Sequence, residues 1–212
     1  MNTEIEYVLP MDIEKRSFEI IESELPHPLD PELAPIIKRV IHTTADFEYA
    51  DTLYFSPQVR EKALAALQKG ATIVTDTTMA LSGINKPALE RHGCRAVSFI
   101  GDPAVAEAAK KNGTTRSREA VDRAAELPGP LIFAVGNAPT ALLRIRELIL
   151  EGRLDPALVI GVPVGFVNVV QAKELLIETG VPCIVARGRK GGSNVAAAIC
   201  NALLYLQGRP GV

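Results

Sequence analysis

The most informative segment for binding chemistry is a basic, glycine-rich loop at residues 187–194, which reads Arg-Gly-Arg-Lys-Gly-Gly-Ser-Asn. A helical pattern begins at about Ser193, so the cationic side chains lie beside the free backbone N–H groups of a helix N-terminus. That combination attracts carboxylate or phosphate groups. The spacing GxxxxGKS/T of a nucleotide-binding loop is absent, so we expect an anionic ligand other than a nucleotide. A solvated surface turn is the alternative interpretation of the same residues.

Histidine is the side chain best suited to acid–base chemistry near neutral pH, and the chain has only three, His27, His42 and His92. His27 lies between prolines and His92 precedes a glycine at a predicted helix end, which fits surface or capping positions. On a helical wheel His42 lies opposite the apolar stripe of residues 33–44, and Arg39, three residues earlier, shares its polar side. Both side chains therefore point away from the core contact of their helix, into either a ligand site or solvent. The pattern alone favours solvent.

Composition and charge exclude several classes of protein. The 212 residues include 23 Lys+Arg and 25 Asp+Glu, a formal net charge of −2, with 47% hydrophobic and 23% charged residues. This is the composition of a globular rather than a disordered protein, and the length suits one domain spanning residues 1–212. The near-neutral balance lacks the basic surplus of nucleic-acid-binding proteins, so we expect no nucleic acid partner.

The cysteines and the uncharged stretches indicate the compartment. Cys94, Cys183 and Cys200 form no CxxC and no zinc-site spacing, and three is an odd number for a disulfide framework. We therefore expect no metal site and a reduced, cytoplasmic setting, and the first residues lack the pattern of a signal peptide. Residues 156–172 and 191–208 are uncharged but interrupted by glycine, proline, serine or asparagine, so we interpret them as buried core, with no membrane association.

Five short β-rich runs alternate with helical patterns, at residues 71–75, 96–100, 131–135, 158–162 and 183–186. Strand runs separated by helices predict a mainly parallel, five-stranded sheet, and their nearly continuous apolar character predicts helices on both faces, a three-layer α/β/α architecture. The N-terminal third forms a helical segment with two helical patterns and no strong strand. Ser56-Pro57 and Asp102-Pro103 are typical helix starts, and the last helix is expected from about Ser193 to Leu206.

Ligands of an open parallel sheet bind beyond the carboxyl ends of its strands. The loops that follow those ends place Asn137, Thr140 and Gly165 at the expected edge, besides the basic loop. For any one loop, a tight strand–helix turn without a ligand is the alternative. Arg116, in a Thr-Arg-Ser sequence, and Ser17, within the apolar stripe of the first helix, are further candidates. An ordinary surface arginine and a hydroxyl bonded to its own helix are their respective alternatives.

Several longer motifs resemble those of one known family. The run Ile-Ile-Lys-Arg-Val-Ile-His-Thr-Thr-Ala-Asp-Phe at residues 36–47 is similar to the signature of the precorrin-8X methylmutases, isomerases of corrin (vitamin B12) biosynthesis. Segments that agree are residues 13–21, 75–84, 136–142, 161–167 and 188–193, so the resemblance spans nearly the whole chain in order. One departure is Asn-Val-Val-Gln-Ala-Lys at residues 168–173, where the family commonly has Gly-Ala-Ala-Glu-Ser-Lys.

The resemblance implies a flavodoxin-like fold, a homodimer, and the intramolecular move of a methyl group from carbon C-11 to carbon C-12 of the macrocycle. This 1,5-sigmatropic shift needs no S-adenosylmethionine and no other cofactor. The resemblance assigns the catalytic histidine to His42 and substrate contacts to Ser17, Arg39 and Arg116. One well-placed acid suffices for such a reaction, and histidine suits that role.

The expected partner is therefore a polycarboxylate tetrapyrrole, which gives cobyrinate if it carries cobalt and hydrogenobyrinate if it is metal-free. The chain resembles the cobalt-handling branch more. The expected substrate contacts are Ser17, Arg39, Arg116, Asn137, Thr140, Gly165, Arg189, Lys190 and Ser193. One small subunit hardly covers such a macrocycle, which favours a site at a dimer interface. The alternative function is a non-catalytic tetrapyrrole carrier, which needs the arginines but not His42.

Overall fold

A six-stranded sheet forms the centre of the computed structural model, which describes residues 5–207. The ends of the expected domain, residues 1–4 and 208–212, lie outside the described residues. The strands are β1 Leu53–Phe55, β2 Thr72–Thr75, β3 Arg95–Val97, β4 Leu131–Val135, β5 Leu158–Gly161 and β6 Cys183–Ala186. The helices are α1 Ile13–Glu24, α2 Ala34–Thr44, α3 Tyr49–Thr52, α4 Val59–Gln68, α5 Thr78–Gly83, α6 Lys86–Arg91, α7 Pro103–Asn112, α8 Arg116–Ala125, α9 Pro139–Leu150, α10 Val169–Ile177 and α11 Ser193–Leu206.

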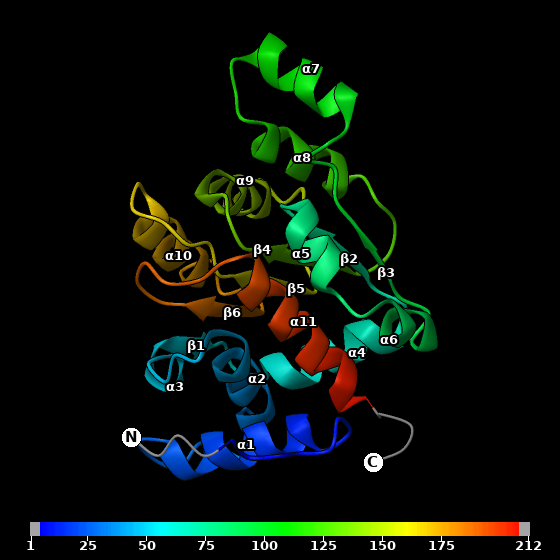
Figure 1. Cartoon of the computed structure of the whole chain (residues 1–212). Helices are drawn as coiled ribbons and strands as arrows, with labels where there is room; N and C mark the ends of the chain where they lie inside the picture. Colours follow the sequence, from blue (N-terminus) through cyan, green and yellow to red (C-terminus); the bar gives the residue numbers. More distant parts are fainter. Residues whose placement is uncertain (1–4, 208–212) are drawn as a thin grey trace.

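The strands lie in the order β1-β6-β5-β4-β2-β3 (Figure 1). Alternate strand residues point into two separate apolar cores, which confirms the three-layer architecture. Ile132 and Ile160 belong to the core under α2, α4, α5, α6 and α11, whereas Phe133 and Val159 belong to the core under α8, α9 and α10. Within residues 5–207 the neighbouring strands are parallel except for β1 and β6, so the carboxyl ends of β2 to β6 meet at one edge of the sheet.

The predicted number of five strands is wrong, because the structure adds β1, paired antiparallel with β6 at the edge of the sheet. β1 has only 3 residues, too few for a period-two pattern to stand out. The Ser56 N–H donates to the Cys183 carbonyl over 3.0 Å, and the Ser56 hydroxyl accepts from the Cys183 N–H over 2.9 Å. Ser56 therefore extends the pairing with β6, and α4 begins at Val59 rather than at Pro57.

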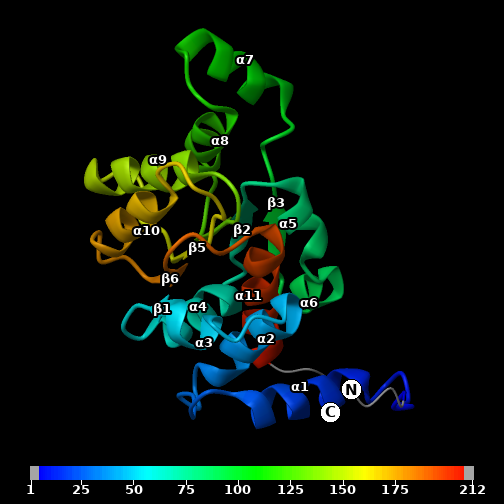
Figure 2. The ribbon, with the colours of Figure 1, turned by 60° about the vertical axis from the view of Figure 1, so that its left-hand side comes forward.

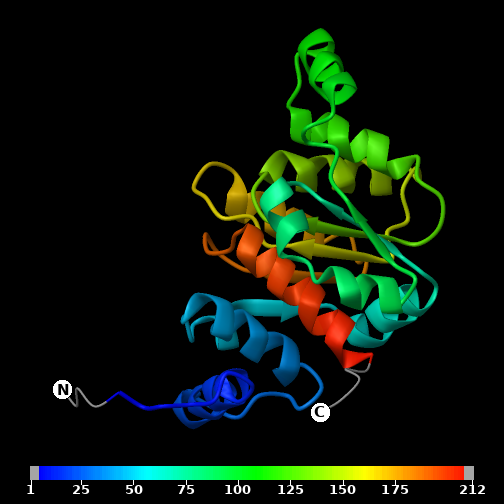
Figure 3. The same cartoon turned by 45° about the vertical axis from the view of Figure 1, so that its right-hand side comes forward.

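Other helix boundaries agree with the sequence. Asp102 caps α7 by accepting from the Ala104 N–H over 2.9 Å, and α11 has the expected bounds. The buried helix α11 crosses one face of the sheet in contact with α2 and α5, as the red helix in Figure 3 shows. The pair α1 and α2 and the pair α7 and α8 lie at opposite ends of the molecule in three views (Figures 1, 2 and 3). Within residues 5–207, every helix falls short of the length or hydrophobicity that crossing a membrane requires.

Candidate active site

His42 lies on the outer face of α2, as the helical wheel predicts. The opposite face is buried in the core through Ile36, Ile37, Val40 and Ile41. The ring of His42 stacks on the ring of Phe18 from α1, with centroids 5.3 Å apart and planes inclined by 18°. Among residues 5–207, no group hydrogen-bonds either ring nitrogen of this exposed side chain. The imidazole nitrogens are therefore available to a ligand.

Arg39 lies beside His42 on the same face and is enclosed by aromatic rings. Its side chain is only 19% exposed. Its guanidinium carbon lies 4.9 Å from the ring centroid of Phe18 and 5.2 Å from that of Tyr205 in α11. The guanidinium also pairs with Glu14 of α1. The cation is thus already partly neutralised within the chain, and an anionic ligand has to share it with Glu14 or displace that carboxylate.

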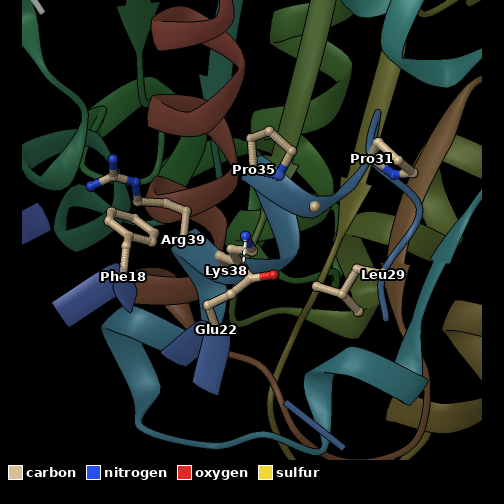
Figure 4. Close-up of a pocket in the computed structure, with 8 residues that line it drawn as sticks. Phe18, Glu22, Leu29, Pro31, Pro35, Lys38 and Arg39 are labelled. Carbon is tan, nitrogen blue, oxygen red and sulfur yellow. Dashed lines mark ion pairs between the residues drawn. The ribbon is translucent and has the colours of Figure 1, made fainter. Parts of the chain in front are cut away.

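A cavity of about 550 Å³ opens beside this pair, and Figure 4 shows the side chains that line it. Phe18 and Arg39 lie together at one end, and Leu29 lies at the other. Lys38 on the wall is ion-paired within the chain. His42 does not line this cavity and is linked to it through Phe18. The lining is mixed, with apolar side chains and the cations Lys38 and Arg39, each paired with a carboxylate of the chain.

Ser17 belongs to α1, and its hydroxyl donates to the backbone carbonyl of Ile13 over 2.8 Å. The structure therefore shows the alternative arrangement, a hydroxyl bonded to its own helix. The oxygen keeps acceptor lone pairs in this arrangement. Ser17 can thus accept a hydrogen bond from a ligand while its own proton stays engaged.

A second group of predicted residues gathers at the carboxyl edge of the sheet. Arg116, the first residue of α8, and Asn137, between β4 and α9, line one cavity of about 420 Å³. Arg116 is exposed, and its guanidinium makes no ion pair or hydrogen bond with residues 5–207. Thr140 joins the same rim, because its hydroxyl accepts from the Thr115 hydroxyl over 3.1 Å. This edge therefore offers a cation and polar groups to a carboxylate.

A buried carboxylate holds this edge in shape. Asp76, at the end of β2, accepts from the three successive backbone N–H groups of residues 136–138 over 2.7 to 2.8 Å. Burial raises the pKa of Asp76, and the three N–H donors act in the opposite direction. The next residue, Thr77, shares a hydrogen bond of 2.8 Å with Ser193. The end of β2 thus ties the loop after β4 to the first turn of α11.

The basic loop is anchored from inside by Lys173 of α10. This side chain is fully buried, and its Nζ donates to the carbonyls of Gly188 and Lys190 over 2.8 Å each. Burial lowers the pKa of Lys173 to about 8. One ammonium group beneath the loop therefore holds two of its backbone carbonyls.

Lys190 connects the basic loop to the segment that follows α2. Its Nζ lies 2.6 Å from Asp46 Oδ2 and 2.5 Å from Glu48 Oε2. Pairing with these carboxylates raises the pKa of Lys190, and the hydrogen bond from Lys190 lowers the pKa of Asp46. The loop is thereby fastened near the end of the helix that carries His42.

Arg189 turns toward the loop between β5 and α10. Its guanidinium carbon lies 5.4 Å from the ring centroid of Phe166, which is 81% exposed. Its carbonyl accepts from the Gly165 N–H over 3.1 Å. Arg189 and Gly165 therefore lie together at the carboxyl edge.

The predicted site residues thus form a group on α1 and α2 and a row along the carboxyl edge, and the two approach each other where Lys190 pairs with Asp46 and Glu48, just beyond α2. His42, Arg39 and Ser17 lie on α1 and α2, whereas Arg116 lies on α8 at the opposite end of the molecule (Figures 1 and 2). The residues at the carboxyl edge are Asn137, Thr140, Gly165, Arg189, Lys190 and Ser193. A ligand that contacts both His42 and Arg116 has to reach across the molecule or be shared between two copies of it.

Sequence reasoning did not single out Phe18, Asp76 or Lys173. Asp76 follows an apolar strand run, and Lys173 is a cation within a largely apolar helix, so a search for polar residues at predicted buried positions could have found both. Phe18 carries no such signal, because an aromatic residue in an amphipathic helix fits a core position equally well. Across residues 5–207, no group of three or more His, Cys, Asp or Glu side chains could hold a metal ion.

Comparisons with known proteins agree on one family. The family model described as precorrin-8X methylmutase matches residues 12–206. The cobalt-precorrin-8 methylmutase of Salmonella typhimurium is 49% identical, covering 92% of this chain and 95% of the relative, and that of Leptospira interrogans is 42% identical, covering 96% of each. The crystal structure of the precorrin-8X methylmutase from Thermus thermophilus matches with a TM-score of 0.85 and 44% identity, covering 92% of this chain and 95% of the other. With this agreement along nearly its whole length, the chain belongs to the precorrin-8X methylmutase family.

Proposed function

We propose that this chain is an isomerase of cobalamin biosynthesis that moves a methyl group from carbon C-11 to carbon C-12 of a precorrin-8 macrocycle. Membership of the methylmutase family supports the activity. The observation that assigns this activity to a particular residue is the exposed imidazole of His42. It has no hydrogen-bond partner within residues 5–207 and lies beside Phe18 and Arg39. The alternative function, a non-catalytic carrier, needs the arginines but not this imidazole.

The reaction requires the protein to orient the substrate and to exchange one proton with it. The bond from the methyl group to C-11 breaks as the bond to C-12 forms, so neither a nucleophile nor a methyl acceptor is required. The protein holds one conformer of the macrocycle. His42 in its imidazolium form donates a proton to the ring system, and the neutral imidazole takes a proton back after the methyl group has moved, because substrate and product are isomers. Stacking on Phe18 uses the face of the imidazole and leaves the nitrogen-bearing edges open to the substrate.

Cations in both groups of site residues are available to carboxylate arms. Arg116 has no ionic partner among residues 5–207, and Arg39 can exchange Glu14 for a substrate carboxylate. Arginine makes charge-assisted, often bidentate, hydrogen bonds with carboxylates. The remaining proposed contacts are Ser17, Asn137, Thr140, Gly165, Arg189, Lys190 and Ser193.

A homodimer would bring the two groups together. We propose that the carboxyl edge of one copy faces α1 and α2 of the other, so that Arg116 of one copy and His42 of the other contact the same macrocycle. The exposed apolar side chains of Met79, Phe166 and Val167, which are 70%, 81% and 77% exposed, support an interface at that edge. At a substrate concentration that limits turnover, a mixture of His42→Ala and Arg116→Ala chains should then be more active than either variant alone, and no gain after subunit exchange would contradict the shared site.

We propose cobalt-precorrin-8 as the substrate, with the cobalt arriving in the macrocycle. Curated relatives at 42%, 44% and 49% identity are named cobalt-precorrin-8 methylmutases, whereas those named precorrin-8X methylmutases are 36% and 37% identical. The Thermus thermophilus structure, at 44% identity, bears the precorrin-8X name. The test is therefore to measure kcat/KM for the cobalt-bearing and for the metal-free macrocycle. A higher kcat/KM for the metal-free macrocycle would contradict the proposal.

The free cysteines support a reducing, cytoplasmic setting. We also propose that residues 1–212 act as one domain.

The His42→Ala variant tests the catalytic assignment. We expect kcat to fall by about 10²- to 10⁴-fold, the usual contribution of a general acid, while the affinity for the corrinoid product stays near that of the wild type. His27→Ala is the matched control, because it removes another exposed histidine. Wild-type turnover by His42→Ala would refute the assignment. A wild type that binds the macrocycle but never converts it would establish the carrier function instead.

A further inference from the structure

We infer that Phe18 is a positioning residue for His42, holding the imidazole so that a nitrogen-bearing edge faces the macrocycle. The inference rests on the proposed function, because it concerns the group to which that function assigns proton donation. No motif predicted the arrangement of this pair, in which a ring from α1 stacks on a ring from α2.

A histidine that donates a proton has to be held in one orientation. Proteins usually achieve this by a hydrogen bond to the second ring nitrogen. No such bond reaches His42 from residues 5–207. An exposed side chain without one changes rotamer on the picosecond-to-nanosecond timescale. Another contact has to supply the orientation, and the stack on Phe18 is the ring contact that the described residues provide.

The geometry of the stack suits this role. The centroid separation of 5.3 Å and the inclination of 18° correspond to offset stacking of two aromatic rings. A neighbouring ring face opposes rotation of the imidazole plane about the bond from Cβ to Cγ. It leaves the ring edges, which carry both nitrogens, uncovered. A hydrogen bond would instead occupy one nitrogen.

Phe18 can impose this orientation because it is itself held on several sides. It packs against the core cluster that includes α2 and α11, and the guanidinium carbon of Arg39 lies 4.9 Å from its ring centroid. Arg39 in turn pairs with Glu14 and lies over Tyr205. Figure 4 shows Phe18 and Arg39 side by side at the end of the cavity. The position of the His42 ring thus depends on the docking of α1 onto α2.

The test compares three substitutions by NMR and by steady-state kinetics. Phe18→Leu keeps an apolar side chain but removes the ring, whereas Phe18→Tyr keeps the ring. Phe55→Leu is the matched control, because Phe55 packs against the same core cluster and has no ring contact with His42. Thermal unfolding of each variant shows that the fold is retained.

In Phe18→Leu we expect the ring-proton resonances of His42 to lose the upfield shift caused by the stacked ring. We expect kcat to fall by about 10- to 100-fold, the usual loss when a reacting group is misplaced, with KM unchanged. Phe18→Tyr and Phe55→Leu should keep both the resonances and kcat. Removing the ring abolishes its ring-current shift wherever the imidazole then lies. The orientation of His42 is therefore measured from nuclear Overhauser contacts between its ring protons and neighbouring side chains, which a merely structural role of Phe18 would leave unchanged.

Two outcomes overturn the inference: wild-type kcat in Phe18→Leu, or a lower kcat with the nuclear Overhauser contacts of the His42 ring unchanged. These failures are distinguishable from failure of the proposed function, which would show as wild-type turnover by His42→Ala. If His42→Ala is inactive while Phe18→Leu is fully active, only the inference about Phe18 is wrong.

Discussion

Replacing Lys173 by methionine should change how the stability of the protein depends on pH. Lys173 is fully buried, and burial lowers the pKa of Lys173 in the folded chain to about 8, against 10.5 for an ordinary lysine. Between these two values the unfolded chain keeps the proton that the folded chain has released. The free energy of unfolding therefore rises with pH across this range. The Lys173→Met variant lacks the titrating group and should lack that rise.

The magnitude follows from the two pKa values. A difference of one pKa corresponds to about 1.36 kcal/mol, so moving from about pH 7 to about pH 9.5 should stabilise the wild type by about 2 kcal/mol relative to Lys173→Met. The stability difference at neutral pH alone is a poorer test. The substitution leaves the carbonyls of Gly188 and Lys190 without their donor, which lowers the free energy of unfolding by about 1–3 kcal/mol for each carbonyl. It also removes a buried charge, which raises the free energy of unfolding, so the two effects oppose each other.

Urea denaturation of both proteins at the two pH values measures the change. Lys62→Met, at an exposed position of α4, is the control for losing a lysine. The decisive quantity is the change with pH in the difference between the wild-type and Lys173→Met free energies of unfolding. A difference that is constant with pH would refute the reasoning from burial. It would mean that the two carbonyls keep the ammonium group charged throughout.

Three further predictions concern the carboxyl edge. Asp76→Asn places an N–H donor where a carboxylate oxygen accepts from the backbone of residues 136–138. The free energy of unfolding, measured by urea denaturation, should therefore fall by about 1–3 kcal/mol, and unchanged stability would contradict the prediction. In Gly191→Ala the new Cβ would lie 2.1 Å from the Val162 carbonyl oxygen, at a φ of +155°. The basic loop should therefore distort, and the affinity for the corrinoid, measured by calorimetry, should fall. Wild-type affinity would show that the loop does not contact the ligand. Arg116→Gln should weaken that binding by about 10- to 100-fold through the loss of a charge-assisted hydrogen bond. Its unfolding transition should stay unchanged, because the guanidinium has no ionic partner within residues 5–207; equal affinity would exclude Arg116 as a carboxylate contact.

Elements with local signals could be predicted from the sequence. Apolar runs identified β4 and β6 at their observed bounds, a capping residue identified the start of α7, and an Ala-rich, uncharged pattern identified α11, since burial on both faces, helix capping and helical pattern depend on residues a few positions apart. β1 left no such signal. Its extension at Ser56 depends on hydrogen bonds with Cys183, 127 residues away. Ser56-Pro57 therefore has the local pattern of a helix start but the tertiary environment of a strand end.

The same division holds for the candidate site. The sequence by itself determined the family, through the order of its motifs, and the shared outward face of Arg39 and His42, through the period of their helix. Only the tertiary structure decided that Arg39 meets Glu14, 25 residues earlier, and that Lys190 meets Asp46, 144 residues earlier. It also decided that His42 stacks on a ring from another helix. Helical periodicity is set by neighbours along the chain, whereas ionic and aromatic partners are set by distances through space, which exist only once the helices and loops have packed.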